Sequence, residues 1–275
     1  LSYANLENFD FSGRDLTGAN LSGQDLSDKD LTSTILRGVN LSYANLENFD
    51  FSGRDLTGAN LSGQDLSSKD LTKTILTGTD LTGTILPDGV LSGNNFQGAI
   101  FDEIDLHGKN LSNSDFSFGS FKNTNLMNTN LKSAKFLDVD FSKIKNKSLA
   151  GADLFLTSFA YSNLSGVNLT DVILQSTNFW NADLIDQDFM VVSNTPIEGV
   201  AFIKANLSNS NFEGVNMSPQ ILYSTVYENK AKLKILSDKD LIENLFDEHE
   251  LVHIVSTEVR GNDLVVSYVF FNSFA

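Results

Sequence analysis

Histidine, glutamate and aspartate are the residue types of this chain that could do chemistry, and one short motif combines two of them. The run His249-Glu250-Leu251-Val252-His253 matches H-E-x-x-H, in which both histidines bind Zn²⁺ and the glutamate acts as base. That chemistry requires a helix, because only there do residues four apart share one face. The β-branched residues Ile254 and Val255 follow at once and favour a strand, which would hold the two histidines ~13 Å apart. We therefore interpret the motif as a chance match and predict no metal site.

No second group of residues suggests catalysis. His107 is the only other histidine, and neither a base nor a nucleophile accompanies it in the sequence. The chain has no cysteine, which excludes thiolate chemistry and a disulfide framework. No glycine-rich loop precedes a helix. The sequence thus predicts a protein that is not an enzyme and holds no cofactor.

The elements that must position any functional residue follow a five-residue period. Leu or Phe recurs at every fifth position from Leu6 to Phe141, which fits neither an α-helix nor a long strand. A small or apolar residue usually lies two places earlier, with an Asn or Asp between them, and together they make a three-residue strand. Ser or Thr and then Gly supply a polar corner. Each pentad is therefore a short strand with a turn, stable only when copies stack.

A longer period sets the number of sides. Residues 1–27 recur letter for letter at 41–67, as a natural tandem duplication or an engineered one would produce. Forty residues hold eight pentads, which divide into two turns of a four-sided tube that rises by one strand spacing, ~4.8 Å, per coil. Equivalent residues 40 apart are then expected on the same side of the tube.

The run A-N/D-L resembles the repeat of the pentapeptide-repeat family. It occurs as Ala4-Asn5-Leu6, Ala19-Asn20-Leu21, Ala152-Asp153-Leu154 and Ala205-Asn206-Leu207. The resemblance covers residues 1–217 and implies a right-handed quadrilateral β-helix. We predict an all-β solenoid of about eleven coils, at four pentads per coil.

The interior of this tube can be predicted from the columns. Phe96, Phe116 and Phe136 are expected in one column and Phe101, Phe121 and Phe141 in the next, as stacked rings without a ligand pocket. The spacing lengthens from five to eight residues after Phe141 and again after Phe189. The extra residues, within 143–147 and 191–196, are expected to form small corner bulges.

The inward position two places before each Leu or Phe alternates in size along the tube. One column reads Phe9, Lys29, Phe49 and Lys69, so we expect each lysine stem to stack between phenylalanine rings. Threonine pairs such as Thr77 and Thr79 are similar to those of ice-binding solenoids. The second threonine, however, takes the inward position, and ice binding is not predicted.

The pattern stops after Met217, and residues 218–275 are predicted to form a small α+β cap. Ser218-Pro219 and Ser237-x-x-Asp240 are helix starts. Residues 251–259 and 264–271 alternate as a β-hairpin around the turn 260–263. A solenoid must cover its open end. An end that is left open would instead favour an end-to-end homodimer.

Charge narrows the classes of partner. The net charge is −16 and the sequence pI is about 4.4, which excludes direct binding to nucleic-acid phosphates. No stretch approaches 18 apolar residues, so no membrane span is predicted. The expected location is the cytoplasm.

Regularly placed aspartates are the remaining candidate site, for binding a protein. We expect them on four successive sides, where they would ring the tube with charge. They are Asp10, Asp15, Asp25, Asp30, Asp50, Asp55, Asp65 and Asp70.

The leading prediction is a rigid acidic scaffold or protein-interaction module. The family resemblance implies an alternative, since some members are similar to a DNA duplex in width and charge, bind DNA gyrase and protect it from quinolones. A second alternative is the β-helical segment of a larger secreted effector.

Overall fold

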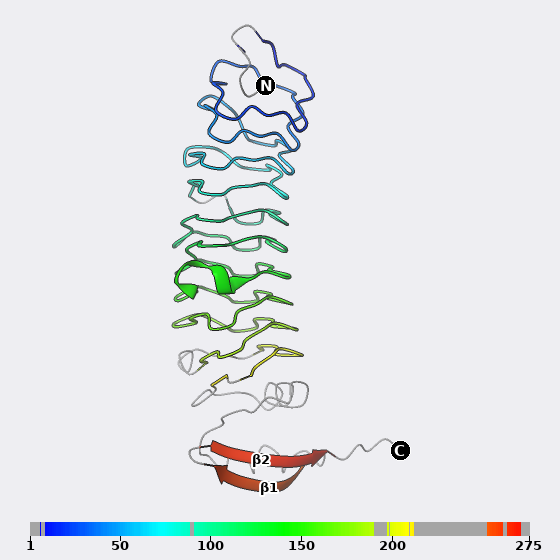
Figure 1. Ribbon diagram of the computed structural model, residues 1–275, viewed down its shortest axis with the longest axis vertical. Helices are drawn as coiled ribbons and strands as arrows, with labels where there is room; N and C mark the ends of the chain where they lie inside the picture. The colour runs from blue at the N-terminus through cyan, green and yellow to red at the C-terminus, as the bar shows by residue number, and fades with distance from the viewer. Residues whose placement is uncertain are drawn as a thin grey trace, which may run out of the picture.

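The chain winds through stacked coils along one long axis (Figure 1). The computed structural model describes residues 6, 9–88, 91–189, 197, 199–208, 210–211, 252–260 and 263–270. Its named elements are two short 3₁₀ turns, η1 (Phe141–Lys143) and η2 (Lys145–Lys147), and two strands, β1 (Val252–Arg260) and β2 (Asp263–Phe270). The coils themselves are held by single β-bridges rather than by long strands.

Neighbouring coils pair in parallel at a fixed offset of 20 residues. On one side the bridges run from Asn20 to Asn40, from Asn40 to Asn60 and from Asn60 to Asp80. The backbone N–H of Leu21 donates to the carbonyl of Asn40 at 2.8 Å, which repeats the hydrogen bonding of a parallel sheet. Residues 40 apart therefore share a side, and the prediction of two coils per long repeat is confirmed.

Four pentads per coil give the tube four sides, which we name after an outward residue of the first coils. In chain order these are the Asp10 side, the Asp15 side, the Asn20 side and the Asp25 side. The outward residues of successive coils are Asp10, Asp30, Asp50 and Asp70 on the Asp10 side, and Asp15, Ile35, Asp55 and Ile75 on the Asp15 side. They are Asn20, Asn40, Asn60 and Asp80 on the Asn20 side, and Asp25, Asn45, Asp65 and Ile85 on the Asp25 side. The Asp10 side and the Asn20 side are opposite each other.

Most corners are tight turns whose third residue has a positive φ. At the corner after Phe11, the N–H of Arg14 donates to the carbonyl of Phe11 at 2.9 Å, and Gly13 has φ of 67°. This is the geometry of a type II turn, for which glycine is the least strained residue. Phe118 takes the same place with φ of 62°, where its side chain is strained.

The central Leu and Phe residues fill the tube. Phe116 stacks between Phe96 and Phe136, with ring centroids 5.1 Å apart on both sides, and the neighbouring column stacks Phe101 on Phe121 at 5.2 Å. Rings of the two columns meet edge to face. All of these side chains are fully buried, so the predicted columns are confirmed, and four interlocking side chains per coil leave no room for a ligand.

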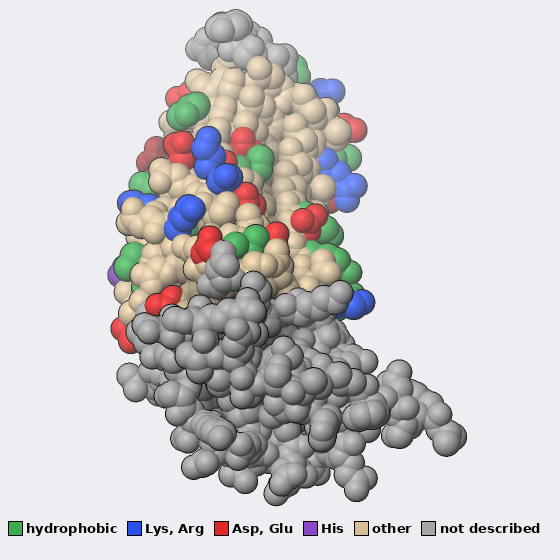
Figure 2. Space-filling model, turned by 60° about the horizontal axis from the view of Figure 1, so that its bottom comes forward, with side chains coloured by type: hydrophobic (Ala, Val, Ile, Leu, Met, Phe, Trp, Pro, Cys, Tyr) green, Lys and Arg blue, Asp and Glu red, His purple; other side chains and the backbone are tan. Residues whose placement is uncertain are grey.

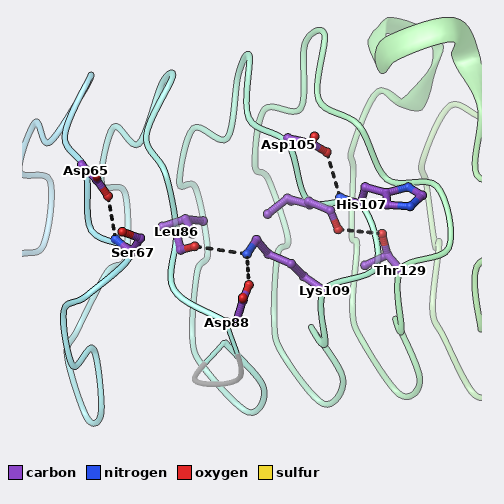
Figure 3. Close-up of polar contacts among 9 residues, drawn as sticks. Asp65, Ser67, Leu86, Asp88, Asp105, His107, Lys109 and Thr129 are labelled. Carbon is purple, nitrogen blue, oxygen red and sulfur yellow. Dashed lines mark hydrogen bonds and ion pairs between the residues drawn. The ribbon is translucent and has the colours of Figure 1, made fainter.

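The inward position has a second role that the sequence analysis missed. There Thr79 Oγ1 donates to the carbonyl of Leu56 at 3.1 Å, and Thr124 Oγ1 donates to that of Phe101 at 2.6 Å. Because the carbonyl of Leu56 already accepts the turn N–H of Ala59 at 2.8 Å, the threonine hydroxyl donates to the second lone pair of that carbonyl. Thr129 Oγ1 makes the same contact with the carbonyl of Leu106 at 3.2 Å, and Figure 3 shows Thr129 at this inward position.

The ammonium groups of Lys69 and Lys109 in this column bind carbonyl oxygens rather than ring faces. Lys69 Nζ donates to the carbonyl oxygens of Leu46 and Glu47. Lys109 Nζ reaches the carbonyl of Leu86 at 3.1 Å (Figure 3). The ring of Phe49 is instead covered by a guanidinium from the next column, that of Arg54. A half-buried ammonium gains more from two carbonyl dipoles than from one ring face, and the packing of the lysine stems between the rings stays a prediction.

Two buried threonines at this position provide a matched test. Thr79 makes the hydrogen bond between coils, whereas Thr84 Oγ1 has no partner although it is also buried. Thr79→Val should lower the free energy of unfolding by about 1 kcal/mol, and Thr84→Val should leave it unchanged or raise it. Urea unfolding followed by circular dichroism measures both. Equal losses would mean that the hydroxyl does not tie the coils.

Extra residues enter at a corner without disturbing the coils. In the coil that contains residues 143–147, the bridges run from Asn130 to Asp153 and from Asp140 to Asn163, so the two bridged residues are 23 apart. From the bridge between Ser148 and Asn168 onward, the offset is again 20 residues. The added residues form η1 and η2, and Ile144 between them is buried in the core. The predicted bulge at 143–147 is thus confirmed. The second predicted bulge, at 191–196, lies outside the described residues.

The hairpin of the predicted cap is present. β1 pairs antiparallel with β2, and the register closes with Arg260 opposite Asp263. The helices predicted within 218–246 lie outside the described residues. The boundary at residue 217 and the capping role of 218–275 remain predictions.

Candidate functional site

The eight aspartates are built into the corners that follow them. The Oδ1 atom of each accepts the backbone N–H two residues later, at 2.8 to 3.1 Å. Figure 3 shows this contact between Asp65 and Ser67 and again between Asp105 and His107. Asn20 makes the same contact with Ser22 at 3.0 Å. One carboxylate oxygen is therefore committed to the fold, which leaves at most the other for a partner.

The expected ring of charge on four sides was wrong. Asp10 and Asp30 differ by one coil of 20 residues and lie on the same side, as do Asp50 and Asp70. The backbone N–H of Gly13 donates to the carbonyl of Thr32, and that of Gly53 to Thr72, which stacks these pentads directly. Half of the set thus forms one line on the Asp10 side. The rest lie on the Asp15 and Asp25 sides, and none lies on the Asn20 side.

The Asp10 side is irregular where the four aspartates follow one another. None of them takes part in a β-bridge, whereas the other three sides are bridged in the same coils. Its inward positions hold large residues such as Phe49 and Lys69, whereas those of the opposite Asn20 side hold Ala19, Val39 and Ala59. The corners that lead into the Asp10 side also differ from most other corners. Their third residues, Asp28 and Ser68, do not have a positive φ. The Asp10 side is the one side with an aspartate in each of these coils, and like charges on neighbouring strands weaken pairing.

Hydrogen bonds keep these carboxylates ionised. The hydroxyl and then the backbone N–H of the following Ser or Thr lower the pKa of Asp15, Asp25, Asp30, Asp65 and Asp70 below the usual aspartate value. Such donors stabilise the charged form. All five residues are exposed. At neutral pH they present charge at fixed positions.

Asp55 is the member of the set whose charge is compensated. Burial raises its pKa, but hydrogen bonds from Thr57 and Arg37 lower it further than burial raises it. Arg37 Nη2 lies 2.6 Å from Asp55 Oδ2. The Asp15 side is therefore less acidic than the sequence suggests.

The lowered pKa values of these aspartates predict that the folded protein loses stability in acid. Because folding lowers these pKa values, the stabilisation is complete above the usual aspartate pKa of about 3.9 and is lost as pH falls through the folded values. Asn at positions 15, 25, 30, 65 and 70 keeps the Oδ1 acceptor but cannot titrate. The fivefold Asn variant should match the parent at pH 7 and lose less stability between pH 5 and pH 2. Thermal unfolding across this range tests it, and parallel pH profiles would contradict it.

The histidines form no site within the described residues. His107 is an exposed corner residue whose backbone N–H binds Asp105 at 3.0 Å. His253 lies in strand β1, as predicted for that segment, while His249 and Glu250 lie outside the described residues. No group of three potential metal ligands occurs in the described part of the chain. The chance-match interpretation of H-E-x-x-H remains a prediction. No helix among the described residues is long and apolar enough to span a bilayer.

Comparison with known sequences finds one family. The sequence model described as pentapeptide repeats matches in eight copies over residues 15–53, 55–93, 110–145 and 149–188, more than half of the chain. No curated protein matches significantly.

Solved structures of the same family are also similar. HetL, a pentapeptide repeat protein involved in heterocyst differentiation regulation in the cyanobacterium Nostoc sp. strain PCC 7120, is 22% identical, with 74% of this chain and 90% of that chain covered and a TM-score of 0.27. A trypsin-treated variant of QnrB1, a plasmid-mediated fluoroquinolone resistance protein, is 16% identical, with 87% and 94% covered and a TM-score of 0.29.

Proposed function

Because this chain belongs to the pentapeptide-repeat family, whose members form right-handed quadrilateral β-helices, we propose that it is a rigid, non-enzymatic scaffold that binds protein partners. Its work is to hold side chains at fixed spacing along a rod rather than to transform a substrate. The proposal places the rod in the cytoplasm, where its net charge of −16 keeps it dispersed.

The hydrogen bonds between the outward aspartates and the backbone of the corners are the observation that supports this proposal. Since Oδ1 of every outward aspartate in the set is bound to the backbone, as it is for Asp65 and Ser67 at 3.0 Å, neither rotation nor proton transfer at that atom is free. What remains is an array of charges that repeats with the coils, ~4.8 Å apart. Acidic, basic and apolar side chains are scattered over the face seen in Figure 2. Such a surface recognises a partner by position and charge.

A comparison of two charge variants tests the scaffold. Asn at positions 10, 30, 50 and 70 removes the line of charge, whereas Asn at 15, 25, 55 and 65 removes the same number of charges from two other sides. Each immobilised rod is incubated with a lysate of the source cells, and bound proteins are quantified by mass spectrometry. We expect partners that bind the folded parent but not the urea-unfolded parent, and that differ between the variants. Identical binding by all three rods and the unfolded chain would contradict the proposal.

DNA gyrase is a second candidate partner, and the line of charge on the Asp10 side favours it. Four carboxylates follow one another up one side at the coil spacing, as phosphates do along one strand of a duplex. A protein that binds DNA through cations would meet a comparable row of anions. We infer that any gyrase contact lies on the Asp10 side.

The same two variants test this candidate in a supercoiling assay. The parent should alter gyrase supercoiling, with an effect that falls steeply between 50 and 200 mM salt. The 10/30/50/70 Asn variant should lose most of that effect, and the 15/25/55/65 variant should keep it. No effect of the parent, or equal effects of both variants, would rule out mimicry on this side and leave the scaffold proposal standing.

A further inference from the structure

An apolar edge runs along the later coils, at the corner between the Asp15 side and the Asn20 side. It consists of one residue from each of five successive coils, namely Phe118, Leu137, Tyr161, Trp180 and Ile203. Backbone bonds join the coils at this corner, from Phe118 N to Leu137 O at 2.8 Å and from Tyr161 N to Trp180 O at 2.9 Å. Phe118 is 57% exposed and Trp180 39% exposed.

The apolar edge has no structural requirement behind it. In earlier coils the same corner holds polar residues followed by glycine, such as Thr57-Gly58 and Thr77-Gly78. Phe118 and Tyr161 occupy the glycine position and take φ of 62° and 60°. A bulky residue at this position lowers stability in two ways, because its backbone conformation is strained and its apolar side chain is exposed to water. Such an outlier points to a function.

The edge is also preorganised. The rings of Tyr161 and Trp180 lie edge to face with centroids 5.0 Å apart, an arrangement that fixes both side chains before any partner arrives. Tyr and Trp are the residue types most enriched at the centres of protein interfaces.

A basic edge borders the same side of the tube. Along the chain, each strand of the Asn20 side here begins at the apolar edge and ends at the next corner, as Phe118 leads to Lys122. That corner carries the lysines of η1 and η2, and we name the set the lysine edge, which consists of Lys122, Lys143, Lys145 and Lys147. All four are exposed, and none forms an ion pair within the described part of the chain. The two edges are separated by a three-residue strand, ~10 Å.

The later part of the rod carries less net negative charge than the first part. Residues 9–88 contain twelve acidic and six basic residues, whereas residues 116–211 contain eight and seven. The line of aspartates lies on the Asp10 side, opposite the Asn20 side. The apolar edge and the lysine edge thus occupy the least acidic part of an acidic rod. The side between them carries Asp140 and Asp183, and each of these carboxylates accepts a hydrogen bond from an asparagine of the next coil.

We propose that these two edges form a docking site for an acidic amphipathic helix of a partner protein. Its apolar face lies on the apolar edge and its carboxylates meet the lysine edge. Five coils span ~19 Å, the length of a helix of about 13 residues, and a helix is about as wide as the ~10 Å side. The site deepens the proposed function, on which it rests, by naming a surface and a class of partner.

The exposed apolar area argues against a second copy as the occupant. The five residues expose on the order of 400 Å², whereas a stable dimer buries ~800 Å² on each partner. In a face-to-face dimer the lysine edge would meet only Asp140 and Asp183 on the Asn20 side, two carboxylates that lie two coils apart, rather than a continuous row. An anionic membrane would extend past the five coils and meet Asp80, Asp102 and Glu103.

Trp180 is the only tryptophan of the chain, so its fluorescence reports on this site alone. The probe is a synthetic amphipathic helix of about eighteen residues, with leucines on one face, glutamates beside them and no Trp. Its addition to the full-length protein should shift Trp180 emission to shorter wavelength. Anisotropy of a labelled copy gives the affinity. A peptide of the same composition in scrambled order should not bind.

Variants that suit the backbone separate binding from folding. Phe118→Gly with Tyr161→Gly restores the residue type of the earlier coils, so this double variant should fold at least as well and bind roughly tenfold more weakly. Gln at positions 143, 145 and 147 should weaken binding severalfold and flatten its salt dependence. Two matched changes elsewhere should have no effect, Tyr43→Ser at a 73% exposed ring and Lys73→Gln at an exposed lysine.

Four outcomes would overturn the docking site. They are no binding of the amphipathic helix, equal binding by the Gly variant, dimerisation in sedimentation that the Gly variant abolishes, and a Trp180 shift with phosphatidylserine vesicles but not with the peptide. If the peptide fails while lysate proteins still bind the folded rod and respond to the aspartate variants, the scaffold proposal survives and only this site is wrong. If no protein binds the rod but the peptide does, the scaffold proposal fails instead.

Discussion

Hydrogen bonding between coils is the constraint on which the rest of the structure depends. Apart from the turn hydrogen bonds at the corners, the backbone of each coil is satisfied by its neighbouring coils, as when Leu21 N–H donates to the carbonyl of Asn40. One residue more or fewer along a strand would turn its Leu or Phe toward water. The five-residue pattern, the filled core and the polar corners all follow from keeping this register coil after coil.

The same constraint decides where the molecule can vary. Three additional residues are accepted at 143–147 because they enter at a corner, and the bridges continue from Ser148 to Asn168 as before. Ile144 supplies a buried side chain that anchors the insertion, and the lysines around it point outward. Variation is thus directed to corners and to outward positions, where new side chains do not touch the core.

The outward surface is divided between opposite sides of the rod. The Asp10 side carries a line of carboxylates over the first coils, and the Asn20 side carries the apolar edge and the lysine edge over the later coils. Because the rod is rigid, neither surface can fold back on the other. Two different partners could therefore bind at once, each recognised by a different physical interaction.

Much of the interior could be predicted from the sequence by itself. The period of five determined which residues are buried, and the 40-residue repeat determined the number of sides. The stacks through Phe116 and Phe121 followed from counting in twenties. The strand after Val252 followed from its β-branched residues. These features depend on local spacing alone, which is why a sequence can reveal them.

The surface was decided only by the tertiary structure. Lys69 binds carbonyl oxygens rather than rings because acceptors from the previous coil lie within its reach. Neighbouring residues of the apolar edge are separated by 19, 24, 19 and 23 positions in the sequence. The separations are unequal because some of these residues occupy the second position of their turn and others the third, and because two insertions lengthen the chain between coils. No fixed period connects Phe118 with Ile203, so the sequence gives no sign of the edge. They meet because hydrogen bonds stack their corners, and a patch made by stacking exists only once the coils are formed.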